Sequence, residues 1–265
     1  MAPAPRKRRR APTNPIETAN RKSDEEFIKD HLQSRFVSPS LKARRKAERR
    51  IPDWTSWTHP KTDKPYALSL KSSSALAQHE LQACFDLVDR TSGADYRASK
   101  DGWRPASKMK EMRSPDLRYI LVKEAAAAAA VAADADGDDG GKICGFTSLM
   151  PTFEEGEAVV YCYEIHLLEE LRGTGMGRLL MDHLVRVAES IPIIEKVMLT
   201  CFLANAGARA FYERLGFERD AISPVERRLR FGKVFVPDYL IMSRRVRGES
   251  ERTKPQNGDS EKTGS

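Results

Sequence analysis

Long apolar runs are missing from this sequence. No stretch of 18 or more apolar residues occurs, and the longest uniform run, residues 125–133, is nearly all alanine and too short to cross a bilayer. The basic N-terminus is not followed by an apolar segment, so it does not have the pattern of a secretory signal. We therefore expect no membrane partner.

Cysteine is scarce, and its spacing is wide. The four cysteines lie far apart, without a Cys-x-x-Cys pair, at Cys84, Cys144, Cys162 and Cys201. Zinc sites built from cysteine normally use closely spaced ligands. The pattern predicts no metal site and buried, reduced thiols of an intracellular protein.

Net charge is almost absent from most of the chain. Residues 1–50 hold 15 Lys/Arg and 6 Asp/Glu, which is +9, whereas the other 215 residues hold 30 and 32, which is −2. A basic nucleic-acid-binding core is therefore excluded. The basic run at residues 6–10 is typical of a nuclear localisation signal, of a contact with ribosome or nucleic acid, or of a solvated tail that carries no targeting signal.

Composition divides the chain into four parts. Residues 1–23 are predicted to be a disordered basic leader, and 24–65 a charged helical segment with an apolar stripe (Phe27, Ile28, Leu32, Phe36) and a Pro-rich connector. Residues 66–246 form the predicted domain, interrupted by a low-complexity loop insertion at 125–141. The polar residues 247–265 are predicted to be a disordered tail.

Apolar periodicity predicts a mixed α/β sheet with helices on both faces. Residues 91–114 are predicted to be irregular. The predicted strands are 66–71, 118–123, 142–150, 159–167, 196–203, 228–236 and 237–245, and the predicted helices are 75–90, 175–190 and 206–215. The strands on either side of the insertion are expected to form a hairpin.

A glycine-rich turn at residues 172–177 separates a strand from an amphipathic helix. Glycine allows the backbone to approach a ligand closely, and a helix N-terminus offers unpaired N–H groups to a phosphate. Such a turn alone is weak evidence, since it is also found as a simple connection. It lacks the Gly-Lys-Ser/Thr of a Walker loop and the spacing of a dinucleotide fingerprint.

The turn matches the Arg/Gln-x-x-Gly-x-Gly/Ala signature, and the chain thereby resembles the GNAT acetyltransferase superfamily. Asn205 and the segment 211–217 (Phe-Tyr-Glu-Arg-Leu-Gly-Phe) follow at the expected distances. The resemblance implies the GNAT fold, with a mostly antiparallel mixed sheet, and acetyl-CoA as co-substrate. It places the cofactor on Ile165, His166, Leu167, Arg172, Gly173, Thr174, Gly175, Met176, Gly177, Arg178, Asn205 and Tyr212.

Residues 160–165, 196–200 and 238–245 resemble the N-terminal acetyltransferase D (NatD) family, which acetylates histones whose N-terminus begins Ser-Gly-Arg-Gly. This implies a histone N-terminal peptide as substrate, a monomer, and a location in nucleus and cytoplasm. The resemblance assigns catalysis to Glu164 and Tyr163, and substrate binding to Tyr96, Tyr163, Thr200 and Tyr239. The acidic contact for the substrate arginine falls in a different register here, at Thr152, Glu154 or Glu155.

The expected chemistry makes two demands on the strand at 159–167. Glu164 is a suitable base if burial raises its pKa, and Tyr163 and Glu164 reach one cleft only if a bulge interrupts the strand's alternation, at about residues 164–166. His166 is either a proton relay or a simple hydrogen-bond partner. Cys162 as an acyl carrier is the less favoured route. Tyr96 and Trp103 are expected to be core aromatics or substrate walls.

Two other functions remain open at this point. The same fold is compatible with acetylation of lysine side chains or small amines. A non-catalytic chromatin adaptor, binding nucleic acid or ribosomes through its basic leader, is the alternative from another class.

Overall fold

The computed structural model describes residues 14–33, 54–125, 141–228, 230–232 and 234–246. The basic run at 6–10, Phe36, the insertion from 126 to 140 and the tail from 247 lie outside these residues, and the expectations for them remain predictions. No helix in the described part of the chain has the length and apolarity to cross a bilayer.

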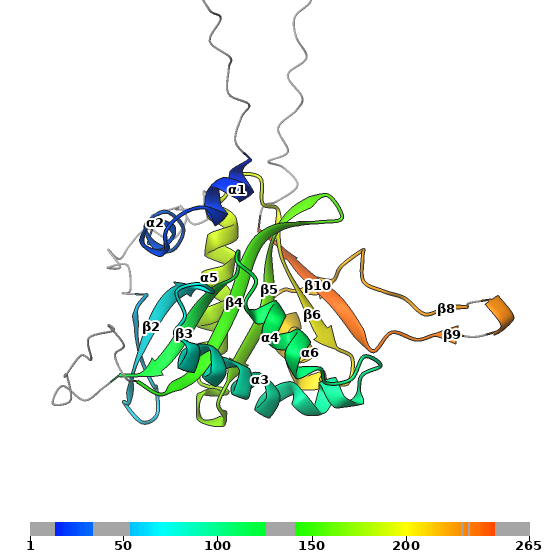
Figure 1. Ribbon diagram of the computed structural model, residues 1–265, viewed down its shortest axis with the longest axis horizontal. Helices are drawn as coiled ribbons and strands as arrows, with labels where there is room; N and C mark the ends of the chain where they lie inside the picture. The colour runs from blue at the N-terminus through cyan, green and yellow to red at the C-terminus, as the bar shows by residue number, and fades with distance from the viewer. Residues whose placement is uncertain (1–13, 34–53, 126–140, 229, 233, 247–265) are drawn as a thin grey trace, which may run out of the picture.

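An eight-stranded sheet organises the molecule, in the order β1-β2-β3-β4-β5-β6-β10-β7 (Figure 1). All neighbouring strands run antiparallel except β5 and β6, which are parallel. The strands are β1 (Ser56–Thr58), β2 (Pro65–Ser72), β3 (Arg118–Glu124), β4 (Ile143–Glu154), β5 (Glu157–Leu167), β6 (Lys196–Phe202), β7 (Glu218–Arg219) and β10 (Tyr239–Arg245). The predicted fold class and the hairpin of β3 with β4 are confirmed.

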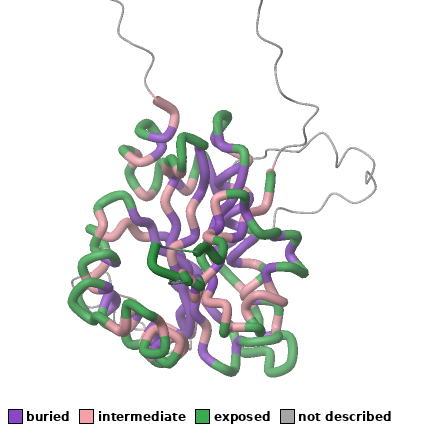
Figure 2. The backbone as a smooth tube through the Cα atoms, turned by 90° about the vertical axis from the view of Figure 1, so that its right-hand side faces the viewer, coloured by how far each residue is buried: buried purple, intermediate pink, exposed green. Residues whose placement is uncertain are grey.

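Helices cover both faces of this sheet. In Figure 1, α3 (Gln78–Ala98) and α4 (Pro105–Met112) lie in front of the strands, whereas α5 (Met176–Ser190) and α6 (Ala206–Arg214) lie behind them. Strand β3 is buried along almost its whole length because both of its faces are covered. Buried residues accordingly gather in the central strands (Figure 2).

The N-terminal segment packs on the domain, so the predicted disordered leader is wrong for its last residues. Helix α1 (Pro15–Asn20) is capped by Asn14, has Pro15 in its first turn and buries Ile16. Helix α2 (Asp24–Phe27) and the π-helical turn η1 (Ile28–Leu32) follow it. Arg118 of β3 holds the segment by binding the Asp24 carboxylate and stacking 4.3 Å over the ring of Phe27.

The region predicted to be irregular is mostly helical. Helix α3 continues to Ala98, and α4 begins at Pro105, which is pre-set for a first helical turn. Both helices are stabilised by contacts that cannot be predicted from the neighbouring sequence. Tyr96 lies against Trp103 and Phe202, and Met112 is buried.

The predicted strand 228–236 is also wrong. It is replaced by a small hairpin of β8 (Arg227–Arg228) and β9 (Val234–Phe235), which projects to the right in Figure 1. The 3-10 turn η4 (Arg230–Gly232) forms its tip, and the ring of Phe231 there is almost completely exposed. The next predicted strand is confirmed as β10.

Candidate active site

The cleft begins where the two parallel strands separate. Pairing of β5 with β6 ends at Cys162 and Leu199, and the rest of both strands diverges. A cavity of about 610 Å³ occupies the opening, within the size range of small-molecule sites. It is lined from β5, β6, α6, the end of α3, α4 and the start of β10. The divergence also leaves one backbone edge of β5 without a strand partner among the described residues.

A β-bulge at Tyr163 turns both candidate catalytic side chains into this cleft. Ser148 of β4 pairs with Glu164, and the next residue, Leu149, pairs with Cys162, so Tyr163 is the extra residue. The bulge is therefore real, but its predicted place at residues 164–166 is wrong, because those residues pair regularly with β4. Tyr163 and Glu164 both line the cavity, as the joint role requires.

Glu164 lies at the base of the cleft as a buried, doubly paired carboxylate. The side chain is 6% exposed, and it receives Lys108 Nζ on Oε1 at 2.8 Å and His166 Nε2 on Oε2 at 2.5 Å. Burial alone raises the pKa of Glu164, but the charges and hydrogen bonds of His166 and Lys108 outweigh it and lower the pKa to about 2. The expectation of a raised pKa is wrong, because sequence reasoning did not foresee the two cations.

His166 makes more than one hydrogen bond. Its Nδ1 lies 2.5 Å from Thr91 Oγ1, and the Thr91 hydroxyl donates its single proton to the carbonyl of Leu87 at 2.8 Å. With the Thr91 hydroxyl donating to Leu87, the histidine donates from Nδ1, and one proton lies between Nε2 and Glu164. A chain of hydrogen bonds thus runs from α3 through His166 to Glu164 and Lys108.

Aromatic side chains form the wall of the cleft opposite β5. Tyr96, at the end of α3, packs with ring centroids 5.1 Å from Trp103 and 4.9 Å from Phe202. The rings of Tyr96 and Trp103 are partly buried, pack on the core and line the cavity; a role as substrate walls remains a prediction.

The three candidates for the contact with the substrate arginine lie at the end of β4 and in the turn between β4 and β5. Glu154 ends β4 and lines the cavity, whereas Glu155 enters the left-handed region (φ 47°) with Gly156 (φ 84°) and faces another surface groove. Thr152 is not among the residues that line the cleft. Burial raises the pKa of Tyr163, and the negative charge of Glu154 raises it further. Glu154 is the candidate that the fold brings to the site.

Thr200 and Tyr239 also reach the cleft, from β6 and β10. The Thr200 hydroxyl lies 2.5 Å from the hydroxyl of Tyr161, so the two rims of the opening are joined beside the last β5–β6 pair.

The glycine-rich turn follows β5 directly and leads into α5. Gly173 (φ 70°) and Gly175 (φ 98°) have left-handed backbone, and a Cβ at either position would meet no atom within 4 Å. Gly175 is the N-cap of the 15-residue α5 and has no side chain to cap it; Met176 N–H has only a long contact of 3.5 Å with Thr174 Oγ1. The backbone here is therefore open to an anion, which fits a pyrophosphate. Gly177 is needed for packing, because a Cβ there would lie 3.2 Å from the ring of Phe211.

The other residues expected at the cofactor differ in position. Ile165, His166, Asn205 and Tyr212 line the cavity, whereas the Met176 side chain is in the core. Arg172 binds the carbonyl of Leu167 through Nε at 3.2 Å, which ties the turn to the end of β5. Asn205 caps α6 by accepting from the N–H of Ala208 at 3.0 Å. Its amide also donates to Asp95 at 3.2 Å.

Two groups in the cleft are kept protonated by burial. Burial raises the pKa of Cys162 to about 12, so it remains a thiol and is a poor acyl carrier at neutral pH. Burial likewise raises the pKa of Tyr212 well above its ordinary value. All four cysteines are free and buried.

Sequence reasoning missed Lys108, Glu111 and Thr91. Lys108 lies in α4, within the segment predicted to be irregular, and 56 positions separate it from Glu164. Pro105, at the start of this short helix, is a signal that could have been found, but the burial of Lys108 could not. Nor could its carboxylate partner.

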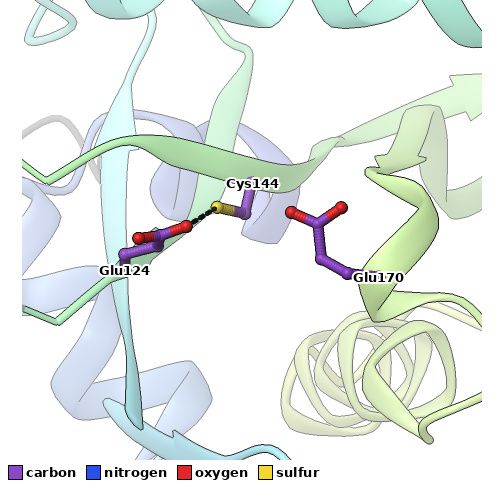
Figure 3. A group of neighbouring side chains, drawn as sticks. All are labelled: Glu124, Cys144 and Glu170. Atoms are coloured by element: carbon purple, nitrogen blue, oxygen red, sulfur yellow. Dashed lines mark hydrogen bonds between the residues drawn. The ribbon is translucent and has the colours of Figure 1, made fainter. Parts of the chain in front are cut away.

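One group of potential metal ligands occurs among the described residues, away from the cleft. Oxygens of Glu124 and Glu170 and the sulfur of Cys144 lie within 4.8 Å of one another (Figure 3). Glu124 accepts from the Cys144 thiol at 3.5 Å and is already paired with Lys64 at 2.7 Å. A neighbouring ammonium ion opposes a second cation there.

Comparison with known proteins agrees with this geometry. Residues 96–217, which include the bulge and the glycine-rich turn, match the model of the Acetyltransferase (GNAT) family. N-alpha-acetyltransferase 40 of Saccharomyces cerevisiae is 30% identical over 198 residues, or 66% of this chain. The aligned part spans 64% of the length of that yeast protein.

Solved structures resemble the chain more distantly. The ribosomal-protein-S18-alanine N-acetyltransferase from Escherichia coli has a TM-score of 0.43 and 17% identity, covering 71% of this chain and 99% of its own. Arabidopsis thaliana NAA60, in complex with a bisubstrate analogue, has a TM-score of 0.46 and 11% identity, covering 68% and 100%. The family model and the yeast relative agree with the sheet described above: the chain has the GNAT fold, and its residues 96–217 are similar to the Acetyltransferase (GNAT) family.

Proposed function

We propose that this protein transfers the acetyl group of acetyl-CoA to the α-amine of a protein N-terminus, and that its substrates are histones beginning Ser-Gly-Arg-Gly. The observation that carries the proposal is the acidic and aromatic cleft at the β5–β6 divergence, together with the open glycine-rich turn that follows the end of β5. A thioester donor and an amine acceptor can enter the cleft from opposite sides.

The residues present suit acetyl-CoA. The edge of β5 at residues 165–167, which pairs with no strand among the described residues, offers backbone donors and acceptors to an extended pantetheine. The pyrophosphate would lie at Gly173, Gly175 and the N-terminus of α5, where the backbone is open and the helix dipole favours negative charge. Arg172 and Arg178 add positive charge at the same place.

The pocket suits a basic peptide. Its lining includes more acidic than basic side chains, and Glu154 reaches it beside Tyr161 and Tyr163. The yeast relative is named an N-alpha-acetyltransferase, which supports a terminal α-amine over a lysine. A histone substrate would also fit the expected location in cytoplasm and nucleus.

The chemistry is within reach of these residues. A terminal α-amine has a pKa of about 7.7–8.0, so it is deprotonated roughly 3 kcal/mol more easily than a lysine. The Glu164–His166 pair is placed to accept the proton of the amine after the pair has released the proton that its two members share. The thioester supplies an activated acetyl group, and the protonated Tyr212 can donate a hydrogen bond at that end of the cleft.

The deciding test is mass spectrometry of peptides after incubation with the full chain and acetyl-CoA. We expect one added acetyl group on the N-terminal residue of a Ser-Gly-Arg-Gly peptide. A peptide with a blocked α-amine and free lysines should stay unmodified. Acetylation of lysine or of a small amine in place of the α-amine would favour the rival enzymes, and absence of acetyl-CoA binding in calorimetry would favour a non-catalytic adaptor.

Glu154→Gln should raise KM for this peptide about tenfold, with kcat little changed. A charge-assisted hydrogen bond to the substrate arginine is worth about 1.5–3 kcal/mol, and an amide retains only part of it. Steady-state kinetics against peptide concentration checks this. Glu155→Gln is the matched control, because this neighbouring carboxylate faces away from the cleft and should leave KM unaltered. If the two substitutions changed KM equally, the proposal that Glu154 binds the substrate arginine would be wrong.

A further inference from the structure

Lys108 is the cation beneath the cleft to which the resemblance assigns no role. It is 9% exposed, and its ammonium group donates to Glu164 Oε1 and Glu111 Oε1, both at 2.8 Å. Nζ also lies 4.9 Å from the centroid of the Tyr96 ring. The three contacts come from three different elements: β5, α4 and α3.

Lys108 remains protonated and positively charged. Burial lowers the pKa of Lys108, but the carboxylate charges of Glu164 and Glu111 outweigh it and raise the pKa above its usual value. A buried ammonium that is fully paired is costly to assemble, and removing a partner from such a pair is more costly still. Lys108 is therefore a fixed positive charge 2.8 Å from the carboxylate that the reaction would use.

The position of the Lys108 ammonium group affects proton transfer to the Glu164–His166 pair. In the arrangement in which the Thr91 hydroxyl donates to Leu87 and His166 donates from Nδ1, the Glu164–His166 pair holds one shared proton. While that proton is present, the pair has no site at which to accept another from the substrate. Losing it leaves a net negative charge on the pair, and a cation 2.8 Å away stabilises that charged form.

We propose that Lys108 is a positioning residue of the acetyl-transfer site: it anchors the Glu164 carboxylate toward His166 and sets the pH at which the pair becomes able to accept the amine proton. This inference rests on the proposed acetyl transfer. The proton of the substrate amine passes to the Glu164–His166 pair as the N–C bond forms and the C–S bond of the thioester breaks. CoA leaves as the thiolate, and the pair releases its proton before the next turnover, so the net products are the amide and the CoA thiol.

Several other titratable groups face this cluster. Those that interact with Glu164 or Lys108 are Tyr96 from α3, Glu111 from α4, Tyr119 from β3, Cys162 and His166 from β5, and Tyr212 from α6. Burial raises the pKa of the three tyrosines and the cysteine, so they stay neutral across the working range. Only Glu111 and Lys108 add charge of fixed sign beside the pair.

The test compares kcat/KM as a function of pH for the full chain and its variants, with the Ser-Gly-Arg-Gly peptide. Lys108→Met keeps the stem of the side chain but removes the charge. The acidic limb of the kcat/KM profile of Lys108→Met should shift to higher pH by about 1–3 units. Its kcat at pH 7 should fall. Lys108→Arg should retain the wild-type limb. Lys110→Met, on the exposed side of the same helix, is the control and should not differ from wild type.

A second variant keeps the proposal testable if Lys108→Met does not fold. Glu111 is 42% exposed, so Glu111→Gln should fold, and it removes a negative charge that opposes Lys108. Its limb should move in the opposite direction, to lower pH. The titration of the substrate amine is common to all variants and cancels in the comparison.

The outcomes separate the two proposals. Wild-type protein that acetylates no N-terminal peptide overturns the proposed function. Active wild-type protein, with Lys108→Met binding acetyl-CoA normally and its acidic limb unmoved, overturns the role of Lys108 alone. A limb that does not move in Glu111→Gln counts against it in the same way.

Discussion

Replacing Gly175 by valine is expected to weaken acetyl-CoA binding by at least about 100-fold. The residue has φ 98° at the N-cap of α5, a conformation that a β-branched residue adopts only with strain of about 1–3 kcal/mol. The new side chain would also project into the open space in front of the turn. Losing two backbone hydrogen bonds to a charged phosphate, at about 1.5–3 kcal/mol each, accounts for the size of the effect.

Isothermal calorimetry with acetyl-CoA measures this loss. The matched control is Gly232→Val, because Gly232 has a similar backbone (φ 73°), also meets no atom within 4 Å, and lies at the tip of the β8–β9 hairpin. It should bind acetyl-CoA like wild type. Wild-type affinity in Gly175→Val would show that the turn does not hold the pyrophosphate.

Glu164→Gln is expected to lower kcat by about 10²–10⁴-fold, which is the usual contribution of a positioned acid or base. The amide keeps the size of the side chain but has no carboxylate to share a proton with His166. Acetyl-CoA binding should persist, since the glycine-rich turn lies elsewhere. The amide also leaves Lys108 with less compensation, so a lower thermal midpoint is expected together with the rate effect.

Single-turnover kinetics at saturating acetyl-CoA and peptide isolates the chemical step. Glu213→Gln, an exposed position on α6, serves as the control for the loss of one carboxylate. A Glu164→Gln protein that turns over at the wild-type rate would exclude Glu164 from proton transfer.

The parts of the site that the sequence predicted are those encoded by contiguous residues. The strand before the turn, the glycines with left-handed backbone and the helix after them lie within residues 157–190, and local periodicity together with steric rules identifies them. Gly216, which follows α6, has φ 81°, the left-handed conformation in which glycine commonly ends a helix.

The parts that could not be predicted depend on how distant segments pair. The position of the bulge is set by the register of β5 against β4, so alternation within β5 alone could not locate it at Tyr163. Glu154 and Glu155 have the same chemistry and differ only in the turn that separates them. The low pKa of Glu164 requires a lysine 56 positions away, from a helix whose polar sequence gave no strong periodic signal.

The divergence of β5 from β6 ties the cofactor to the stability of the fold. A sheet whose interior strands separate leaves backbone groups at its centre that no other part of the described chain pairs. A ligand that hydrogen-bonds along that edge acts as a missing strand, and it binds the folded chain in preference to the unfolded one. Thermodynamic linkage then adds RT ln(1 + [L]/Kd) to the free energy of unfolding, about 2.7 kcal/mol at a ligand concentration 100 times Kd. The cellular supply of acetyl-CoA would therefore set the lifetime of the folded protein as well as its rate of turnover.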